Sequence, residues 1–171
     1  MKALLVIDMI NDFVKKGGAL DCGKSARRIV PFVRRTIEEF HRKGQPVLFV
    51  CDSHRPDDRE FRQFPPHGIK GTEGARVIAK LPVGSKDILI PKTRYSAFTK
   101  TGLEKALRKH RVSEVHVVGV CTSICVMDTV GDLRDRDYPV VVYRAGVADF
   151  DPPAHRFALR RMEKTYGATI A

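Results

Sequence analysis

The sequence predicts an α/β protein: a three-layer fold in which a mostly parallel sheet is covered by helices on both faces. Two observations carry this prediction. Apolar stretches alternate along the whole chain with segments of helical periodicity. The strand-like stretches are also continuously apolar, which is typical of strands buried on both sides. With 171 residues, no internal repeat and no linker, the chain is expected to form a single domain over residues 1–171.

The expected elements follow one another as strand and helix. Continuous apolar runs predict strands at 2–8, 46–52, 86–91, 115–120, 138–146 and 168–171, six in all. Helical spacing predicts helices at 24–43, 99–109, from the fourth strand to about 136, and at 153–166. Gly44 marks the end of the first helix. Residues 52–75 are rich in Pro, Gly, His and charge, so we expect a long loop there, and long loops in compact domains are often functional.

The net charge of +11 and the isoelectric point near 9.8 raise the question of a polyanionic partner. The basic residues lie mainly at 25–43, 103–111 and 155–164, where they alternate with apolar residues at helical spacing. Solvated helix faces explain that pattern. The chain has no glycine-rich phosphate loop, paired CxxC motif or aromatic RNA-binding signature. Nucleic acid is therefore an unfavoured partner, and a nonenzymatic basic binding module is the distant alternative.

The beginning of the chain, MKALLVIDMINDF, contains only a short apolar run that Asp8 interrupts. It predicts neither a signal peptide nor a membrane span, so we expect a cytoplasmic protein. The four cysteines are too few and too irregularly spaced for a disulfide framework, and a reducing compartment keeps them as thiols.

Chemically reactive side chains follow four of the predicted strands. In an open parallel sheet the ligand crevice lies beyond the carboxyl ends of the strands. Each residue alone has an ordinary explanation, such as a turn cap, a solvated lysine or a packed cysteine. Together they predict a site with a carboxylate, an acid and imidazole pair, an ammonium and a thiol. In chain order these residues are Asp8, Asp52 with His54, Lys92, and Cys121 with Cys125.

Three stretches, LLVIDMINDF, PKTRYSAF and GVCTSICVMDT, resemble the signature stretches of the isochorismatase-like cysteine hydrolases. The terminal pattern H..AL..M...YG fits as well, so the resemblance covers nearly the whole chain. CDSHRP followed by FPPHGIKGTEGA resembles the metal loop of the nicotinamidase branch. We therefore expect strand order 3-2-1-4-5-6, and the resemblance favours a homo-oligomer.

The resemblance also implies the roles of individual residues. It assigns the catalytic triad to Asp8, Lys92 and Cys125, and one divalent metal ion to Asp52, His54 and His67. Zinc is the expected metal, with iron and manganese as alternatives. A cis peptide bond is expected between Val120 and Cys121, with the N–H groups of Cys121 and Cys125 forming an oxyanion hole. Phe13 and Phe64 would wall a flat substrate ring by stacking.

The spacing of Cys121 and Cys125 allows several readings. A zinc pair would need two further ligands, and neither neighbouring turn offers a Cys or His. A disulfide between them remains open, although it would consume the nucleophile. A helix amino terminus and a nearby lysine favour a thiolate. Cys125 aligns with the family nucleophile, and the sulfur of Cys121 is expected to be packed without a chemical role.

The expected activity follows from these assignments. A cysteine hydrolase of this kind would deamidate nicotinamide to nicotinate and ammonia through a thioester. The near alternative is a hydrolase of the same superfamily that acts on a different small amide or on a vinyl ether.

Overall fold

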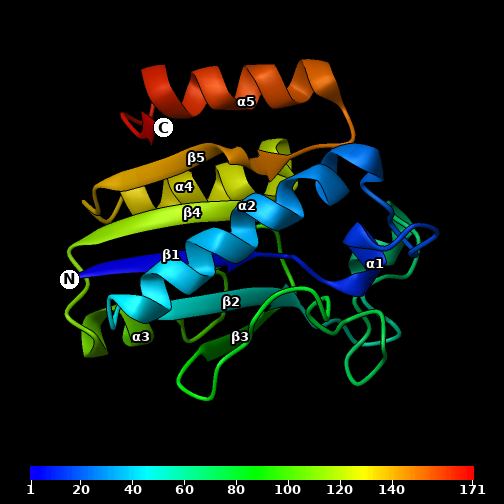
Figure 1. Cartoon of the computed structure of the whole chain (residues 1–171). Helices are drawn as coiled ribbons and strands as arrows, with labels where there is room; N and C mark the ends of the chain where they lie inside the picture. Colours follow the sequence, from blue (N-terminus) through cyan, green and yellow to red (C-terminus); the bar gives the residue numbers. More distant parts are fainter.

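A computed structural model describes all residues, 1–171, and confirms the predicted α/β fold (Figure 1). One six-stranded sheet has the order β3-β2-β1-β4-β5-β6, and every pairing is parallel. Its strands are β1 Lys2–Ile7, β2 Val47–Asp52, β3 Ile88–Lys92, β4 Glu114–Val120, β5 Val140–Ala148 and β6 Thr169–Ile170. The helices are α1 Asn11–Val14, α2 Gly23–Arg42, α3 Leu103–Lys109, α4 Met127–Arg134 and α5 Pro152–Lys164.

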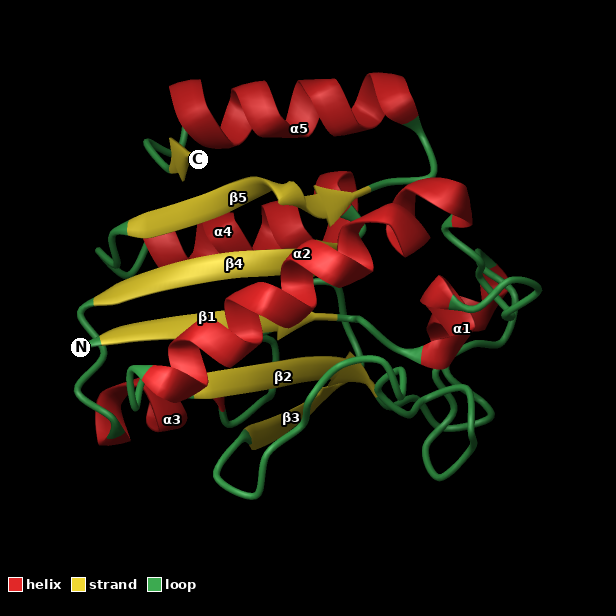
Figure 2. Ribbon diagram, viewed as in Figure 1, coloured by secondary structure: helices red, strands yellow, loops and turns green.

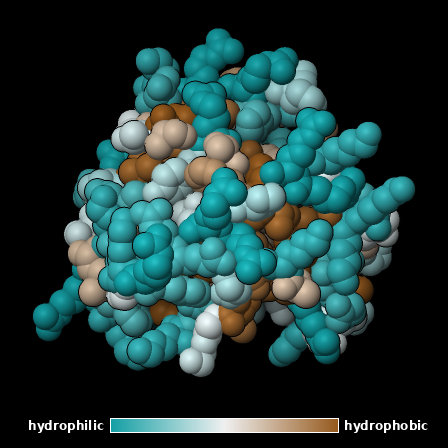
Figure 3. All heavy atoms as spheres, in the orientation of Figure 1, coloured by the Kyte–Doolittle hydropathy of each residue, from teal (hydrophilic) through white to brown (hydrophobic).

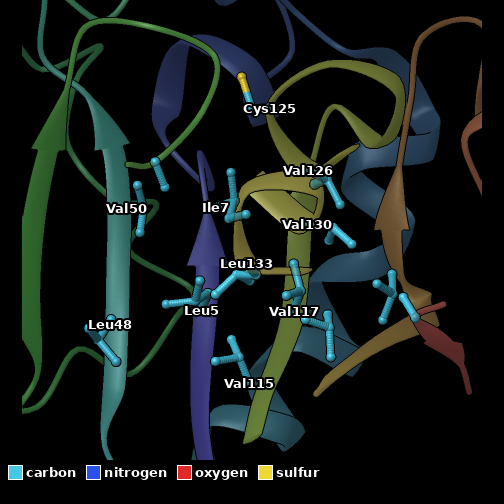
Figure 4. Close-up of a cluster of buried hydrophobic side chains, with 14 of the residues drawn as sticks. Leu5, Ile7, Leu48, Val50, Val115, Val117, Cys125, Val126, Val130 and Leu133 are labelled. Atoms are coloured by element: carbon cyan, nitrogen blue, oxygen red, sulfur yellow. The ribbon is translucent and has the colours of Figure 1, made fainter. Parts of the chain in front are cut away.

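The two faces of the sheet are covered by different helices. Figure 2 shows α2 in front of the sheet and α4 behind it. One apolar core joins the sheet to the buried side of α2, which presents residues three or four positions apart: Ala26, Ile29, Val30, Val33, Ile37 and Phe40. A second core joins the other face to α3, α4 and α5 (Figure 4). The central strands β1 and β4 are buried on both sides, which explains why their sequences do not alternate.

Helices α2 and α5 begin and end where local chemistry favours it. α2 stops before Gly44, whose φ of 62° is left-handed and suits glycine. α5 begins after Asp151, whose side chain accepts a hydrogen bond from the Ala154 N–H at 3.1 Å, and Pro152 occupies its first turn. The solvent face over α2 is mainly hydrophilic, with long side chains projecting outward (Figure 3), as the helical spacing of the basic residues predicts. No helix is both long enough and apolar enough to cross a membrane.

Some element boundaries differ from the sequence predictions. The one-turn helix α1 was not predicted. α3 starts at Leu103 rather than at 99, because the Thr101 hydroxyl accepts the Leu103 N–H and keeps the preceding residues in a turn. β5 continues to Ala148 past a register shift opposite Gly119. The long loop after β2 contains a short 3₁₀ helix, Arg59–Arg62, and regular structure resumes only at β3.

The carboxyl ends of the strands point toward α1 and the long loop, on the right of Figure 1. The chain leaves β1 through Asp8, which has a left-handed φ of 52°. The chain leaves β4 through a cis peptide bond between Val120 and Cys121, as expected. A π-helical turn, Thr122–Val126, follows and leads into α4. This edge of the sheet is where the reactive side chains gather.

Gly119 provides a test of this packing. It has a φ of 127°, and an added Cβ would lie 2.0 Å from the Ile7 carbonyl oxygen in the neighbouring strand. Gly119→Ala should therefore lower the free energy of unfolding by about 3 kcal/mol or more, as measured by urea denaturation. Gly102→Ala is the control, because a Cβ added there would have no atom within 4 Å. Equal stabilities of the two variants would contradict this account of the β1–β4 contact.

Candidate active site

Lys92 is the centre of the predicted site. Its ammonium is fully buried at the end of β3, and three acceptors surround it. The Nζ atom lies 2.8 Å from Asp8 Oδ2, 2.5 Å from Asp52 Oδ1 and 3.5 Å from Cys125 Sγ. A buried ammonium is stable only when it is paired with opposite charge and hydrogen-bonded. The structure therefore brings together the three residues that the sequence places after β1, at β3 and after β4.

The strand ends set the positions of these groups. Asp52 lies opposite Lys92 in the β2–β3 register. Asp8 follows β1, and its N–H donates to the Val50 carbonyl at 2.8 Å. Asp8 Oδ1 accepts the backbone N–H of Asp52 at 2.9 Å. Cys125 lies in the π-helical turn after β4, and Figure 4 shows its sulfur beyond Ile7 at the end of the apolar core.

Burial controls the protonation of the cluster. It raises the pKa of Asp8 to about 6, the charge of Asp52 adds to the increase, and the ammonium of Lys92 opposes it. Burial also raises the pKa of the Cys125 thiol well above its usual value, because the attraction of Lys92 does not outweigh burial and the two carboxylates. The resting state is therefore a thiol beside an ionised Asp8 at neutral pH. This differs from the thiolate that the sequence favoured.

Asp52, His54 and His67 form a buried group whose ligand atoms all lie within 4.8 Å of one another. His54 Nε2 is 3.5 Å from Asp52 Oδ1, and His67 Nε2 is 3.6 Å from Asp52 Oδ2. His54 Nε2 is buried and has no hydrogen-bond partner. One carboxylate and two imidazole nitrogens that face a common point fit a divalent metal ion. The sequence-predicted ligands are thus brought together.

The outer nitrogens of the two histidines have other partners. His54 Nδ1 contacts Asp58 Oδ2 at 3.1 Å, and His67 Nδ1 contacts the Pro65 carbonyl at 2.7 Å. Such contacts fix the orientation of a metal-binding imidazole and leave Nε2 for the metal. The Glu60 carboxylate lies 3.6 Å from His67 Nε2 and was missed in the sequence, because a glutamate in a charged loop gives no distinctive pattern. Burial would lower the pKa of His67, but hydrogen bonds to Asp52 and Glu60 raise it to about 10. The space between these three side chains therefore favours a positive charge.

The loop that carries His67 is held against α1. Asp12 Oδ2 accepts the N–H of Gly68 at 2.8 Å, and the Asp12 N–H donates to the Gly74 carbonyl at 3.0 Å. A Cβ at Gly74 would lie 2.2 Å from the Asp12 carboxylate, so only glycine allows this approach. Asn11 Nδ2 also donates to the Glu73 carbonyl at 2.7 Å. These contacts were not predicted, yet Asp12 and Asn11 belong to the NDF end of the first signature stretch.

A small cavity of about 30 Å³ lies between Cys125 and two of the candidate metal ligands, Asp52 and His67. Its lining includes Cys125, Cys121, Asp52, His67, Glu60, Tyr95, Leu20, Ile124 and three phenylalanines, Phe13, Phe64 and Phe150. Phe13 and Phe64, for which the resemblance predicts stacking on a substrate ring, both line this cavity. The volume accommodates only a water molecule or two, so a ring-sized amide can enter only if side chains at the opening move. Phe150, which is 54% exposed, is the most exposed of the three phenylalanines.

Cys121 has a neighbour that the sequence did not indicate. Its Sγ lies 3.1 Å from Cys22 Sγ, and all four cysteines are free thiols. The neighbouring turns contain no Cys or His, and this contact could not be recognised in the sequence because Cys22 and Cys121 are 99 residues apart in the chain. The backbone N–H of Cys121 donates none of the hydrogen bonds of the fold, while its carbonyl accepts the N–H groups of Ile124 and Val126.

Comparison with known proteins identifies the class to which this fold and site belong. The chain matches the isochorismatase domain over residues 2–171. A crystal structure of nicotinamidase/pyrazinamidase PncA from Bacillus subtilis has a TM-score of 0.95 and 39% identity, covering 99% of this chain and 98% of that one. N-carbamoylsarcosine amidase from Thermoplasma acidophilum has a TM-score of 0.90 and 36% identity, covering 99% and 94%. Pyrazinamidase of Pyrococcus horikoshii in complex with zinc has a TM-score of 0.94 and 31% identity, covering 99% and 98%.

The chain belongs to the isochorismatase family, and within it to the nicotinamidase-like branch. These similarities confirm the resemblance on which the sequence interpretation relied. They also identify the chain as an amidohydrolase.

The metal group can be tested by removing one ligand. We expect His54→Ala to lose bound metal, because the remaining carboxylate and imidazole form a weaker site. Metal content per chain should be measured by elemental analysis, alongside circular dichroism to check the fold. His41→Ala is the control, since His41 pairs with Asp87 on the surface, far from this group. Full metal content in His54→Ala would remove His54 from the ligand set.

Proposed function

We propose that this protein hydrolyses nicotinamide to nicotinate and ammonia, with Cys125 as the nucleophile. The observation that carries the proposal is that one cavity is lined both by Cys125 and by Asp52 and His67 of the candidate metal-binding group. The Cys125 sulfur lies 3.5 Å from the Lys92 ammonium, which is itself paired with Asp8. The first set suits attack on a carboxamide, and the second suits recognition of a ring nitrogen. The Cys125 cluster and the metal-binding group would therefore bind opposite ends of a single substrate.

The acylation half of the reaction follows from the resting protonation states. Asp8 accepts the proton of the Cys125 thiol, and the sulfur attacks the amide carbon. The oxyanion that forms is held by the backbone N–H groups of Cys121 and Cys125. Asp8 then returns the proton to the leaving nitrogen, and ammonia departs to leave a thioester.

The second half regenerates the enzyme. Asp8 takes a proton from water, and the hydroxide attacks the thioester carbon. The carboxylic acid leaves, and the Cys125 sulfur recovers a proton. Lys92 keeps Asp8 in place and balances its charge throughout. Burial would lower the pKa of Lys92, but Asp8, Cys125 and Asp52 raise it well above its usual value, so it stays an ammonium.

Asp52, His54 and His67 would hold a divalent metal ion, for which we propose zinc. A bound ion of this kind supplies an open coordination position that a pyridine nitrogen can occupy. Phe13 and Phe64 would stack against the ring and orient its carboxamide toward Cys125.

A different small amide is the second candidate. The cavity of about 30 Å³ favours a compact substrate, and the similarity to N-carbamoylsarcosine amidase supports a linear one. The same Cys125 chemistry would serve, while the metal-binding group would contact a polar atom other than a ring nitrogen.

The nucleophile assignment predicts different effects for the two neighbouring cysteines. Cys125→Ala should abolish ammonia release, by roughly 10⁴-fold or more in kcat, because no other group can form the thioester. Cys121→Ala should retain much of the activity, since only its backbone contributes to the chemistry. Ammonia release should be followed with both variants after their folding has been checked. Equal loss in the two variants would assign the chemistry elsewhere.

The substrate assignment predicts discrimination against benzamide, which has the same carboxamide and ring size but no ring nitrogen. Its kcat/KM should be lower than that of nicotinamide by at least about 10-fold, because water remains where the ring donor would bind. N-carbamoylsarcosine should be assayed in the same series. Equal kcat/KM for nicotinamide and benzamide would mean that the ring nitrogen is not recognised, and turnover of the linear amide alone would favour the second candidate.

A further inference from the structure

Cys22 and Cys121 form a close thiol pair that takes no part in the proposed hydrolysis. Cys22 directly precedes α2 and Cys121 directly follows β4. Their sulfurs are 3.1 Å apart, within the distance of a thiol hydrogen bond. The only other hydrogen bond of the Cys22 sulfur is a weak one to the Leu20 carbonyl at 3.5 Å. Two sulfurs this close need to approach by only about 1 Å to reach the length of a disulfide bond.

We propose that this pair is an oxidation site, at which hydrogen peroxide converts the two thiols into a Cys22–Cys121 disulfide. The Cys121 sulfur attacks one oxygen of hydrogen peroxide, the O–O bond breaks, and the departing hydroxide takes up the thiol proton, which leaves a sulfenic acid and water. The Cys22 sulfur then attacks the Cys121 sulfur, which forms the S–S bond and releases a second water. The protein loses two hydrogens and two electrons, and the peroxide takes them up as water.

The order of these steps follows from access. Cys121 lines the cavity and is 8% exposed, whereas Cys22 has no exposed surface. A hydroperoxide as small as hydrogen peroxide suits a cavity that admits a water molecule or two. The hydrogen bond with Cys22 raises the pKa of Cys121, and burial adds to the increase, so the pair rests as two thiols. Once Cys121 is oxidised, the adjacent Cys22 sulfur reacts with the advantage of proximity.

The disulfide would change the catalytic turn. Closing the gap from 3.1 Å to bonding distance brings the two sulfurs together by about 1 Å. The Cys121 carbonyl accepts the Ile124 and Val126 N–H groups at 3.1 and 3.2 Å, on either side of Cys125. A shift of Cys121 is therefore passed to the nucleophile and to the N–H proposed for the oxyanion hole. This consequence rests on the proposed function, whereas formation of the disulfide does not.

Peptide mapping tests the chemistry independently of activity. Trypsin places Cys22 on the peptide 17–24, and both Cys121 and Cys125 on the peptide 112–134. After hydrogen peroxide treatment and alkylation of the remaining thiols, mass spectrometry should find these peptides linked and two hydrogens lighter than their sum. In Cys125→Ala the longer peptide contains Cys121 as its only cysteine, so persistence of the link there identifies Cys121. Oxygen addition without a link, or a link that disappears in Cys125→Ala, would overturn the proposal.

Two further variants serve as controls for the pair. Cys22→Ser should remove the link, because the resolving sulfur is gone. Cys51→Ser should retain it, since Cys51 lines a different cavity beside β3. A link that survives in Cys22→Ser, or that is lost in Cys51→Ser, would assign the oxidation to other thiols.

Activity measurements then test whether the Cys22–Cys121 disulfide slows hydrolysis. Oxidised wild-type protein in which mass spectrometry finds Cys125 still alkylatable should release ammonia from nicotinamide at least about 10-fold more slowly than reduced protein. Dithiothreitol should break the link and restore the rate. Unchanged turnover in protein with a complete disulfide would overturn the inference that the disulfide slows hydrolysis. If the reduced protein released no ammonia from any amide, the proposed function would fail, while a linked peptide would still establish the oxidation site.

Discussion

The buried ion pairs of Lys92 are the interaction on which the site depends. The Asp52 and Asp8 carboxylates share one ammonium at 2.5 and 2.8 Å, and none of the three groups has significant exposure. Removing any partner would leave an uncompensated buried charge, which is strongly destabilising. Only a sheet in which β1, β2 and β3 are parallel neighbours brings these carboxyl-terminal residues together. The order of the strands is therefore a requirement for the chemistry of the site.

Asp52 joins the two halves of the site. One of its oxygens contacts Lys92 and the other faces His67, so the same carboxylate supports the catalytic cluster and the metal-binding group. Burial raises the pKa of Asp52, but Lys92 and the imidazoles lower it below its usual range, so it remains ionised. With Asp8 and Glu60 nearby, the carboxylates outnumber the single ammonium, and this excess negative charge favours a divalent cation.

The sequence predicted most of the fold and the central residues of the site, and its failures have a common cause. Strands such as β1 and β4 are apolar throughout and are recognisable from their own residues. The reactive groups at their ends were found because strand ends have a known place in a parallel sheet. The contacts that were missed are Cys22 with Cys121, Asp12 with Gly68 and Glu60 with His67, and each includes a residue from an irregular segment. No local period describes such segments, and the pairing of residues distant in sequence leaves no trace in either one.

The difference between regular strands and irregular segments matters for substrate specificity. Asp8, Lys92 and Cys125 lie at or just beyond the ends of regular strands, whereas the cavity beside them is formed largely by irregular segments that carry Leu20, Glu60, Phe64 and Phe150. Loops accept substitutions more readily than buried strands, so the chemistry can stay constant while the accepted amide changes. The cavity is too small for a ring as it stands, and the Phe150 side chain at its edge is largely exposed. Under the proposed function, the residues that decide the substrate are thus those that must move to admit it, and not Asp8, Lys92 and Cys125.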